Sequence, residues 1–159
     1  MIIRTARVDD AECIAGFWNP LIRDTSVTFS TIEKTPEGLR ADIKARGDAF
    51  LVAEDSGQVV GLATYGPFRG GPGYRHTVEH TVILAPCARG QGTGRALMAR
   101  LEDQARHAGL HVMVAGVSSE NPGAVAFHER IGYQKVGLMP ETGRKFGRWM
   151  DLILLQKLL

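Results

Sequence analysis

The sequence predicts an α/β domain with a mixed, mostly antiparallel twisted sheet of about seven strands and about four helices. Three observations predict this class. Two short apolar runs flank the turn Asp55–Gln58, which indicates an antiparallel hairpin. A β-branched run from His76 to Leu84 leads into a glycine-rich loop and an amphipathic helix. A nearly continuous apolar run, His111 to Val117, follows that helix and indicates a parallel crossover.

The first half of the chain is predicted to hold one strand, two helices and the hairpin. Asp9 or Asp10 can cap a helix whose apolar residues recur at helical spacing. Thr35-Pro36-Glu37 has the N-cap, the proline and the acidic residue of a second helix start. The expected strand covers residues 2–8. The first expected helix ends at about residue 23, and the second covers 36–46. The expected hairpin strands are 50–54 and 59–65.

The second half is predicted to alternate strands with helices after a glycine- and proline-rich loop over 66–74. Glycines end both helices, and no repeat, low-complexity tract or linker interrupts the pattern. We therefore expect a single domain over residues 1–159. The expected strands are 76–84, 111–117, 134–140 and 147–156, and the expected helices are 92–108 and 122–131.

The composition excludes several classes of protein. Lysine and arginine number 19 against 17 aspartate and glutamate residues, so no basic field argues for nucleic acid. No apolar run approaches a membrane span, and the first residues lack the apolar core of a secretion signal. Cys13 and Cys87 cannot make a disulfide framework. We expect a cytoplasmic protein with free thiols.

The glycine-rich loop is the most informative segment for function. Gly90, Gly92 and Gly94 allow main-chain amides to close around an anion at the positive end of the following helix. A nucleotide P-loop would need lysine and serine or threonine where Arg95 and Ala96 stand. A dinucleotide-binding loop would follow the first strand with GxGxxG spacing. The pattern Q/R-x-x-G-x-G/A fits instead.

Arg89, Gly92 and Gly94 carry that pattern, and Asn121 and the pair Gly132-Tyr133 follow downstream. On these residues and on the order of its predicted elements, the whole chain resembles the GNAT acetyltransferase superfamily. The resemblance implies that loop amides hold the pyrophosphate of acetyl-CoA and that the preceding strand pairs with its pantetheine arm. The implied cofactor-binding residues are Val82, Ile83, Leu84, Arg89, Gly90, Gln91, Gly92, Thr93, Gly94, Arg95 and Asn121.

A narrower resemblance is spread over most of the chain. The segments Arg75–His80, His111–Val117, Phe127–Glu129 and Lys145–Asp151 are similar to the phosphinothricin and methionine sulfoximine N-acetyltransferase group. The group implies transfer of acetyl from acetyl-CoA to the α-amino group of a small amino acid or analogue, in a homodimer. Phosphinothricin, methionine sulfoximine and methionine sulfone are the leading candidate acceptors.

Acetyl transfer to an amine needs a proton acceptor for the amine and a proton donor for the CoA thiolate. Glu79 is the candidate base, because its β-branched neighbours desolvate the carboxylate, and the family resemblance places the acidic residue there too. The alternatives are a surface glutamate on the solvent face and a salt-bridge partner of Arg75. His128 stands where many relatives carry tyrosine and is the candidate acid, with a structural histidine as the alternative. Tyr133 is then expected in the core.

Asn121 is expected to contact the pantetheine arm, to cap the short helix after it, or both. Three residues later many relatives carry serine, and Ala124 stands there in this chain. One polar contact to the cofactor is therefore expected to be missing.

A small amino acid needs a group that binds its carboxylate, and Arg75 can offer two parallel donors beside the Glu79 strand. The aromatic and basic residues nearby can line or cover the pocket, either within one chain or across a dimer interface. The predicted substrate-binding residues are Phe29, Phe68, Arg75, Thr77, Glu79, Lys145 and Trp149.

Other interpretations stay open at this point. His76 and His80 lie four residues apart, but no third ligand is evident, so no metal site is predicted. A peptide N-terminus or a polyamine are alternative acceptors, although a polyamine pocket should be acidic. A non-catalytic acyl-CoA-binding module would keep the loop and would not need Glu79. A nucleotide-binding regulator is disfavoured by the missing lysine and hydroxyl.

Overall fold

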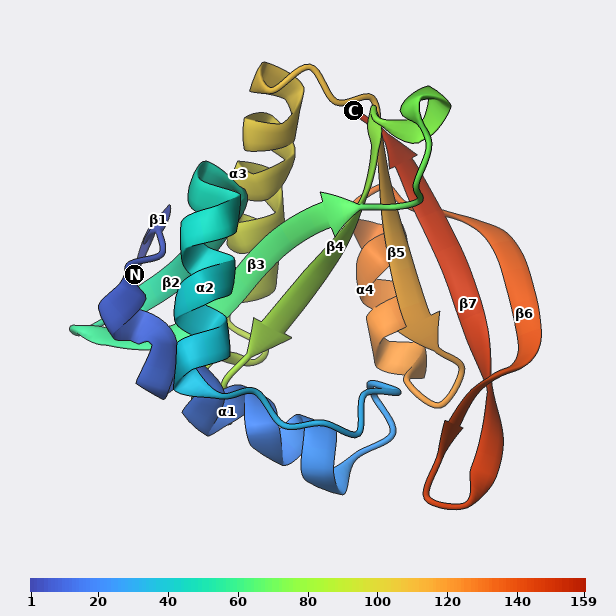
Figure 1. Cartoon of the computed structure of the whole chain (residues 1–159), viewed down its shortest axis with the longest axis horizontal. Helices are drawn as coiled ribbons and strands as arrows, with labels where there is room; N and C mark the ends of the chain where they lie inside the picture. Colours follow the sequence, from blue (N-terminus) through green and yellow to red (C-terminus); the bar gives the residue numbers. More distant parts are fainter.

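A computed structural model describes all residues, 1–159. One seven-stranded sheet forms the middle of the protein, in the order β1-β2-β3-β4-β5-β7-β6 (Figure 1). Every neighbouring pair is antiparallel except β4 and β5. The strands are β1 (Ile2–Thr5), β2 (Phe50–Asp55), β3 (Gln58–Pro67), β4 (Thr77–Leu84), β5 (Val112–Ser118), β6 (Gln134–Lys145) and β7 (Arg148–Leu158). The predicted class and element order are confirmed.

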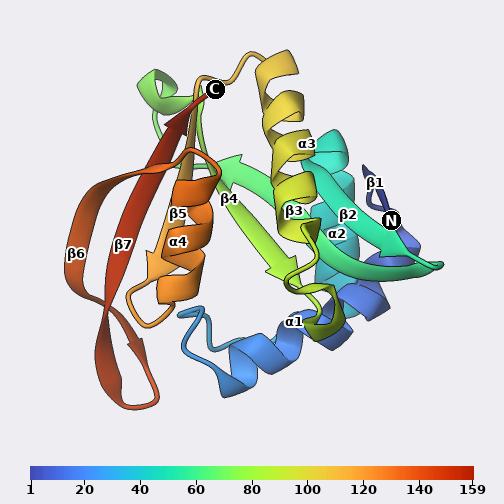
Figure 2. The ribbon, with the colours of Figure 1, turned by 180° about the vertical axis from the view of Figure 1, so that it is seen from behind.

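Four α-helices cover the two faces of the sheet. The helices α1 (Ala11–Asp24) and α2 (Pro36–Arg46) lie on one face, and α3 (Thr93–His107) and α4 (Pro122–Arg130) lie on the other (Figures 1 and 2). None of these helices combines the length and the apolar character needed to cross a membrane.

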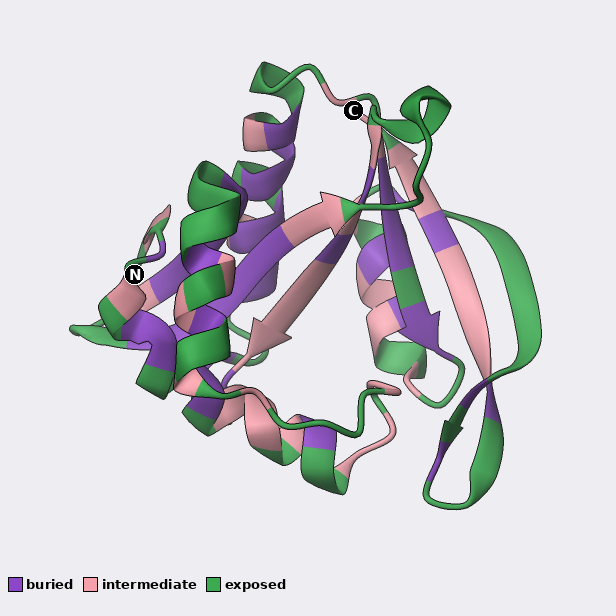
Figure 3. Cartoon of the chain, viewed as in Figure 1, coloured by how far each residue is buried: buried purple, intermediate pink, exposed green.

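The core has two parts, one on each face, because each helix buries one apolar stripe against the sheet. Leu97 and Leu101 of α3 belong to the larger cluster, and Ile14 of α1 and Leu39 of α2 belong to the smaller one. Figure 3 shows the buried positions running along the central strands and the inward helix faces. Burying each such side chain contributes about 1.5–3 kcal/mol to stability.

The predicted boundaries hold best where a cap fixes them. Thr35 accepts a hydrogen bond from the Gly38 amide at 3.0 Å and starts α2, as its sequence predicts. The last hairpin is longer than the pattern indicates. A bulge between Met139 and Gly143, with Glu141 at a φ of 55°, lets β6 continue beyond Pro140.

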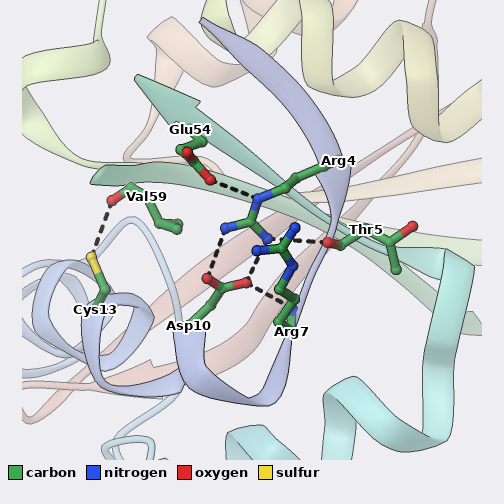
Figure 4. A network of polar contacts seen from close by, with 7 residues as sticks. All are labelled: Arg4, Thr5, Arg7, Asp10, Cys13, Glu54 and Val59. Atoms are coloured by element: carbon green, nitrogen blue, oxygen red, sulfur yellow. Dashed lines mark hydrogen bonds and ion pairs between the residues drawn. The ribbon is translucent and has the colours of Figure 1, made fainter. Parts of the chain in front are cut away.

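Asp10 precedes α1 but its carboxylate does not cap the helix. It accepts hydrogen bonds from Arg4 Nη1 and Nη2 at 2.8 and 2.9 Å and from the Arg7 amide at 2.7 Å, while Arg4 Nε donates to Glu54 at 2.7 Å (Figure 4). Burial acts to raise the pKa of Asp10, but these hydrogen bonds outweigh it and hold the pKa below its ordinary value. The cluster fastens β1 and the start of α1 to β2.

Asp10→Asn is expected to lower the free energy of unfolding by about 2 kcal/mol at neutral pH, because it leaves the Arg4 guanidinium without its anionic partner. The folded pKa of Asp10 is depressed, so this stabilisation is present above the pKa of the unfolded carboxyl and is lost as pH falls through the folded value. Urea unfolding over a pH series should show the gap to wild type closing on acidification. The exposed Asp9→Asn is the control, and an equal loss there would contradict the assignment.

The one parallel pair in the sheet is short. Thr77–Glu79 of β4 pairs with Val112–Val114 of β5, and beyond this point β4 keeps only β3 as a partner and β5 keeps only β7. The two strands diverge from there, as Figure 1 shows. The sheet therefore opens in its middle, at the end of β4 that leads into the glycine-rich loop.

Candidate active site

A cavity of about 1040 Å³ lies where β4 and β5 separate. Its lining comes from α1 and the α1–α2 connection on one face, and from the glycine-rich loop and α4 on the other. The second half of β4 and the second half of β5 form its two sides. One cavity therefore joins the predicted anion-binding loop to the point where the strands part.

The glycine-rich loop has the conformation that its sequence predicts. Gly90 and Gly92 have φ values of 74° and 81°, and Gly92 is the N-cap of α3. Few residues other than glycine adopt this region, so the loop shape depends on them. The side chain of Gln91 donates to the Cys87 carbonyl at 2.7 Å and braces the loop from within. The main-chain amides at this helix end are thereby fixed around a site suited to an anion.

Gly94 has a different role from the two glycines before it. It is buried, and a Cβ built on it would lie 3.3 Å from Phe127 of α4 and 3.5 Å from Leu84 of β4. A side chain there would push α4 away from α3. Arg89, Arg95 and Arg130 also line the cavity, which gives this end a positive character suited to phosphate.

The predicted pantetheine-binding segment lies along one side of the cavity. Val82, Ile83 and Leu84 are half-buried, and no strand pairs with their β5-facing edge. An extended ligand could occupy this edge as an added strand. Asn121 accepts from the Ala124 amide at 3.2 Å and also lines the cavity, so it is both the predicted cap of α4 and available to a ligand.

Glu79 lies on β4 at the last position that still pairs with β5. Its carboxylate lies against Gly116, where a built Cβ would be 3.1 Å from Oε2 and 3.5 Å from Cδ1 of Leu152 on β7. Partial burial raises the pKa of Glu79 above its ordinary value. Burial is the only cause of this shift and no cation pairs with the carboxylate, so it stays available to a proton near the opening of the sheet.

His80 and His128 form a pair on the opposite face of β4 from Glu79. Their Nε2 atoms are 2.9 Å apart, and His128 Nδ1 lies 2.7 Å from the Ala124 carbonyl oxygen. A carbonyl only accepts, so His128 Nδ1 carries a hydrogen. In the neutral pair the hydrogen between the rings therefore belongs to His80. Burial lowers the pKa of His80 to about 3 and also lowers the pKa of His128.

Tyr133 packs in the core, as its sequence position predicts, and its ring lies edge-on to both imidazoles at 5.5 and 5.3 Å. Burial and the nearby Glu102 raise the pKa of Tyr133 far above its ordinary value, so it stays neutral. Glu102 itself is paired with Lys157 at 2.7 Å. The hydroxyl of Tyr133 is buried without a hydrogen-bond partner, so its contact with the histidine pair is one of packing.

The predicted acceptor-binding residues do not all come together in one chain. Phe29 lines the cavity, and Thr77 lies on β4 on the same face as Glu79. Lys145 is buried, and its ammonium group donates to the Thr28 carbonyl at 2.9 Å rather than lining the cavity. Phe68, Arg75 and Trp149 are exposed and do not line the cavity. Phe68 and Arg75 lie on the loop before β4. Trp149 lies near the start of β7, where the Arg144 guanidinium stacks over its ring.

Sequence reasoning missed the role of three residues. The sequence marks His80 only as a candidate metal ligand, although its place one residue after Glu79 on a strand puts it on the other face. Phe127 and Arg130 line the cavity from α4, and only the helical spacing around His128 could have pointed to them.

A model of the Acetyltransferase (GNAT) family matches residues 18–133. The chain belongs to the GNAT acetyltransferase family. The L-amino acid N-acyltransferase MnaT of Escherichia coli is 40% identical to this GNAT chain, over 98% of this chain and 92% of that protein. The L-methionine sulfoximine/L-methionine sulfone acetyltransferase of Pseudomonas aeruginosa is also 40% identical, over 97% and 92% of the two chains.

This chain is also similar to a solved structure of a relative in complex with AcCoA. The phosphinothricin acetyltransferase (Pat) of Sinorhizobium meliloti, in complex with AcCoA, superposes with a TM-score of 0.92 at 30% identity. The match covers 99% of this GNAT chain and 88% of that one. The resemblance that the sequence motifs indicate is therefore confirmed at the level of the family.

Proposed function

We propose that the protein transfers acetyl from acetyl-CoA to the α-amino group of a small amino acid or analogue. The acceptors are of the size and polarity of methionine sulfone, methionine sulfoximine and phosphinothricin. The activities named for the MnaT, methionine sulfoximine and phosphinothricin relatives support this choice. One observation of the fold carries it: the half-buried Glu79 lies where β4 and β5 part, beside the cavity that begins at the anion-binding loop.

The residues present fit acetyl-CoA. The loop from Arg89 to Gly94 offers main-chain amides to the pyrophosphate, and Val82–Leu84 offers an unpaired strand edge to the pantetheine arm. Bound there, acetyl-CoA supplies the activated acetyl group. Glu79 takes the proton of the acceptor ammonium, so that the free amine can attack the thioester. The departing thiolate takes a proton from the pair of His80 and His128, on the other face of β4, once that pair has taken up a hydrogen beyond the two that it holds when neutral.

A thiol-release assay tests the proposed function. Acetyl-CoA is offered with L-methionine sulfone, L-methionine sulfoximine, phosphinothricin, a spermidine control and a short peptide with a free N-terminus. Release of CoA with the amino-acid analogues, and not with the polyamine, is the expected result. Binding of acetyl-CoA without turnover on any amine would favour a non-catalytic acyl-CoA-binding module instead.

The anion-binding loop is tested by two alanine substitutions at opposite ends of α3. Gly92→Ala and Gly109→Ala each place a Cβ at a φ of about 80°, and neither Cβ meets another atom within 4 Å. Each is expected to cost about 1 kcal/mol of stability. Only Gly92→Ala should raise KM for acetyl-CoA, by about tenfold, because only it changes the loop amides. An equal KM change in both variants would contradict the assignment.

A homodimer is part of the proposal. β6 is the edge strand of the sheet, and Val136, Leu138 and Met139 on it are 54%, 59% and 45% exposed. A free strand edge with apolar side chains is a surface that a second copy of the chain can cover. Sedimentation velocity should give a dimer, and Leu138→Lys should shift it to monomer. A wild-type monomer at micromolar concentration would overturn this part.

A further inference from the structure

The last part of β6 supports the α1–α2 connection with two residues on one face. Gly143 and Lys145 are buried, while Arg144 between them is exposed and lies over Trp149. The alternation follows from strand geometry. A Cβ built on Gly143 would collide with Cδ2 of Phe29 and lie 2.6 Å from two further ring atoms. The ring of Phe29 therefore rests directly on the backbone of β6.

A hydrogen bond from Lys145 holds the main chain of the α1–α2 connection next to Phe29. Lys145 Nζ donates to the carbonyl oxygen of Thr28, the residue before Phe29, at 2.9 Å. Burial lowers the pKa of Lys145, which agrees with an ammonium group that has left water. Thr28 and Phe29 are thus fixed to β6 by one hydrogen bond and one aromatic contact, at a sequence separation of 117 residues for the bond.

Phe29 also belongs to the wall of the cavity between β4 and β5. Leu152 and Gly116 line the same cavity, and Glu79, which is not itself in the lining, lies against Gly116. In the proposed function, an acceptor whose amine reaches Glu79 would extend its side chain toward this end of the cavity. The ring of Phe29 lies between that space and Gly143, so its position sets how much room the side chain has.

We propose that Gly143 is a specificity-determining residue, because it lets Phe29 lie back against β6 and so leaves room for an acceptor side chain of methionine sulfone length. The proposal rests on the proposed acetyl transfer to amino acids. With alanine at 143 the ring must retreat by about 1 Å to restore ordinary carbon–carbon contact. Lys145 holds the main chain of Thr28, so the ring moves toward the cavity.

The test compares two acceptors that differ by one methylene, L-methionine sulfone and S-methyl-L-cysteine sulfone. The quantity measured is kcat/KM for L-methionine sulfone divided by kcat/KM for S-methyl-L-cysteine sulfone. Gly143→Ala is expected to lower this ratio about tenfold and to leave KM for acetyl-CoA unchanged. Gly143 has an ordinary negative φ, so alanine adds no backbone strain. The ratio is taken within one preparation, so a reduced folded fraction does not alter it.

Two further variants test whether the effect is specific to position 143 and depends on the ring of Phe29. Gly16→Ala, on α1, places its Cβ in open space and should leave the ratio at the wild-type value. Phe29→Ala should raise the ratio, and Gly143→Ala should then have no further effect in that background, because the ring that it displaces is gone. A ratio unchanged by Gly143→Ala, or lowered equally with and without Phe29, would overturn the proposal. If wild-type enzyme acetylates neither sulfone, the proposed function fails instead.

Discussion

Glu79→Gln is expected to lower kcat/KM for the amino-acid acceptor by about 10²–10³-fold, because it removes the group that takes the ammonium proton. The amide keeps the size of the carboxylate against Gly116, so the cavity should keep its shape. Binding of acetyl-CoA, measured by calorimetry, should stay at the wild-type value, since Glu79 lies on the other face of β4 from the His80 side chain. The exposed Glu129→Gln is the matched control.

The pH dependence separates a base from a structural glutamate. Burial raises the pKa of Glu79, and the base acts only when ionised, so wild-type kcat/KM should fall as pH decreases through this raised value. That acidic limb should be absent from the glutamine variant. Burial makes the ionised form costly above the folded pKa, so glutamine should not lower stability at neutral pH. A glutamine variant with the wild-type profile would remove Glu79 from the mechanism.

Much of the candidate site is predictable from patterns of consecutive residues. The loop at 89–94 is predictable because glycines at positive φ and a helix start are properties of consecutive residues. Glu79 is predictable for a similar reason: a lone carboxylate among β-branched residues is marked by its neighbours. The element order followed from periodicity, and the cap at Thr35 fixed one boundary where the apolar pattern alone would have left it vague.

Contacts between distant segments were not predictable in this way. No period links Lys145 to Thr28 or His80 to His128, which are 117 and 48 residues apart. The sequence marks Lys145 as basic and near the last strand, and this favours a substrate contact. The fold instead turns its side chain onto the α1–α2 connection. Such roles depend on the register of β6 with β7, which a bulge shifts and which composition does not specify.

The histidine pair raises a question of proton count. The contacts of His128 with Ala124 and of the two Nε2 atoms with each other use two hydrogens, which is all that two neutral imidazoles hold. His80 Nδ1 is then bare, buried and without a partner. The neutral pair therefore has no hydrogen to give to a thiolate. Donation to the thiolate would therefore require the pair first to take up a third hydrogen from solvent water, and the negative charge that develops on a departing sulfur favours that form.

The groups around the pair bear on this third proton. Glu102 lies near His128 and raises its pKa against the lowering by burial. Glu102 is itself neutralised by Lys157 at 2.7 Å and by Arg106 at 3.6 Å. Burial therefore favours the neutral form of the pair. In the proposed mechanism His128 would act as the donor only together with His80, whose Nε2 lies 2.9 Å from its own.

His128→Phe is expected to lower kcat by about 10²-fold with little change in KM for acetyl-CoA, because it removes the donor to the thiolate.

His80→Leu should lower kcat in the same way and move the basic limb of its pH profile to lower pH, since a protonated His128 then lacks an acceptor for its Nε2 hydrogen. His80→Gln keeps an acceptor there and should restore part of the loss. Adding His80→Leu to His128→Phe should change little, because the two residues form one unit. A leucine variant with the wild-type basic limb would leave His80 with packing alone.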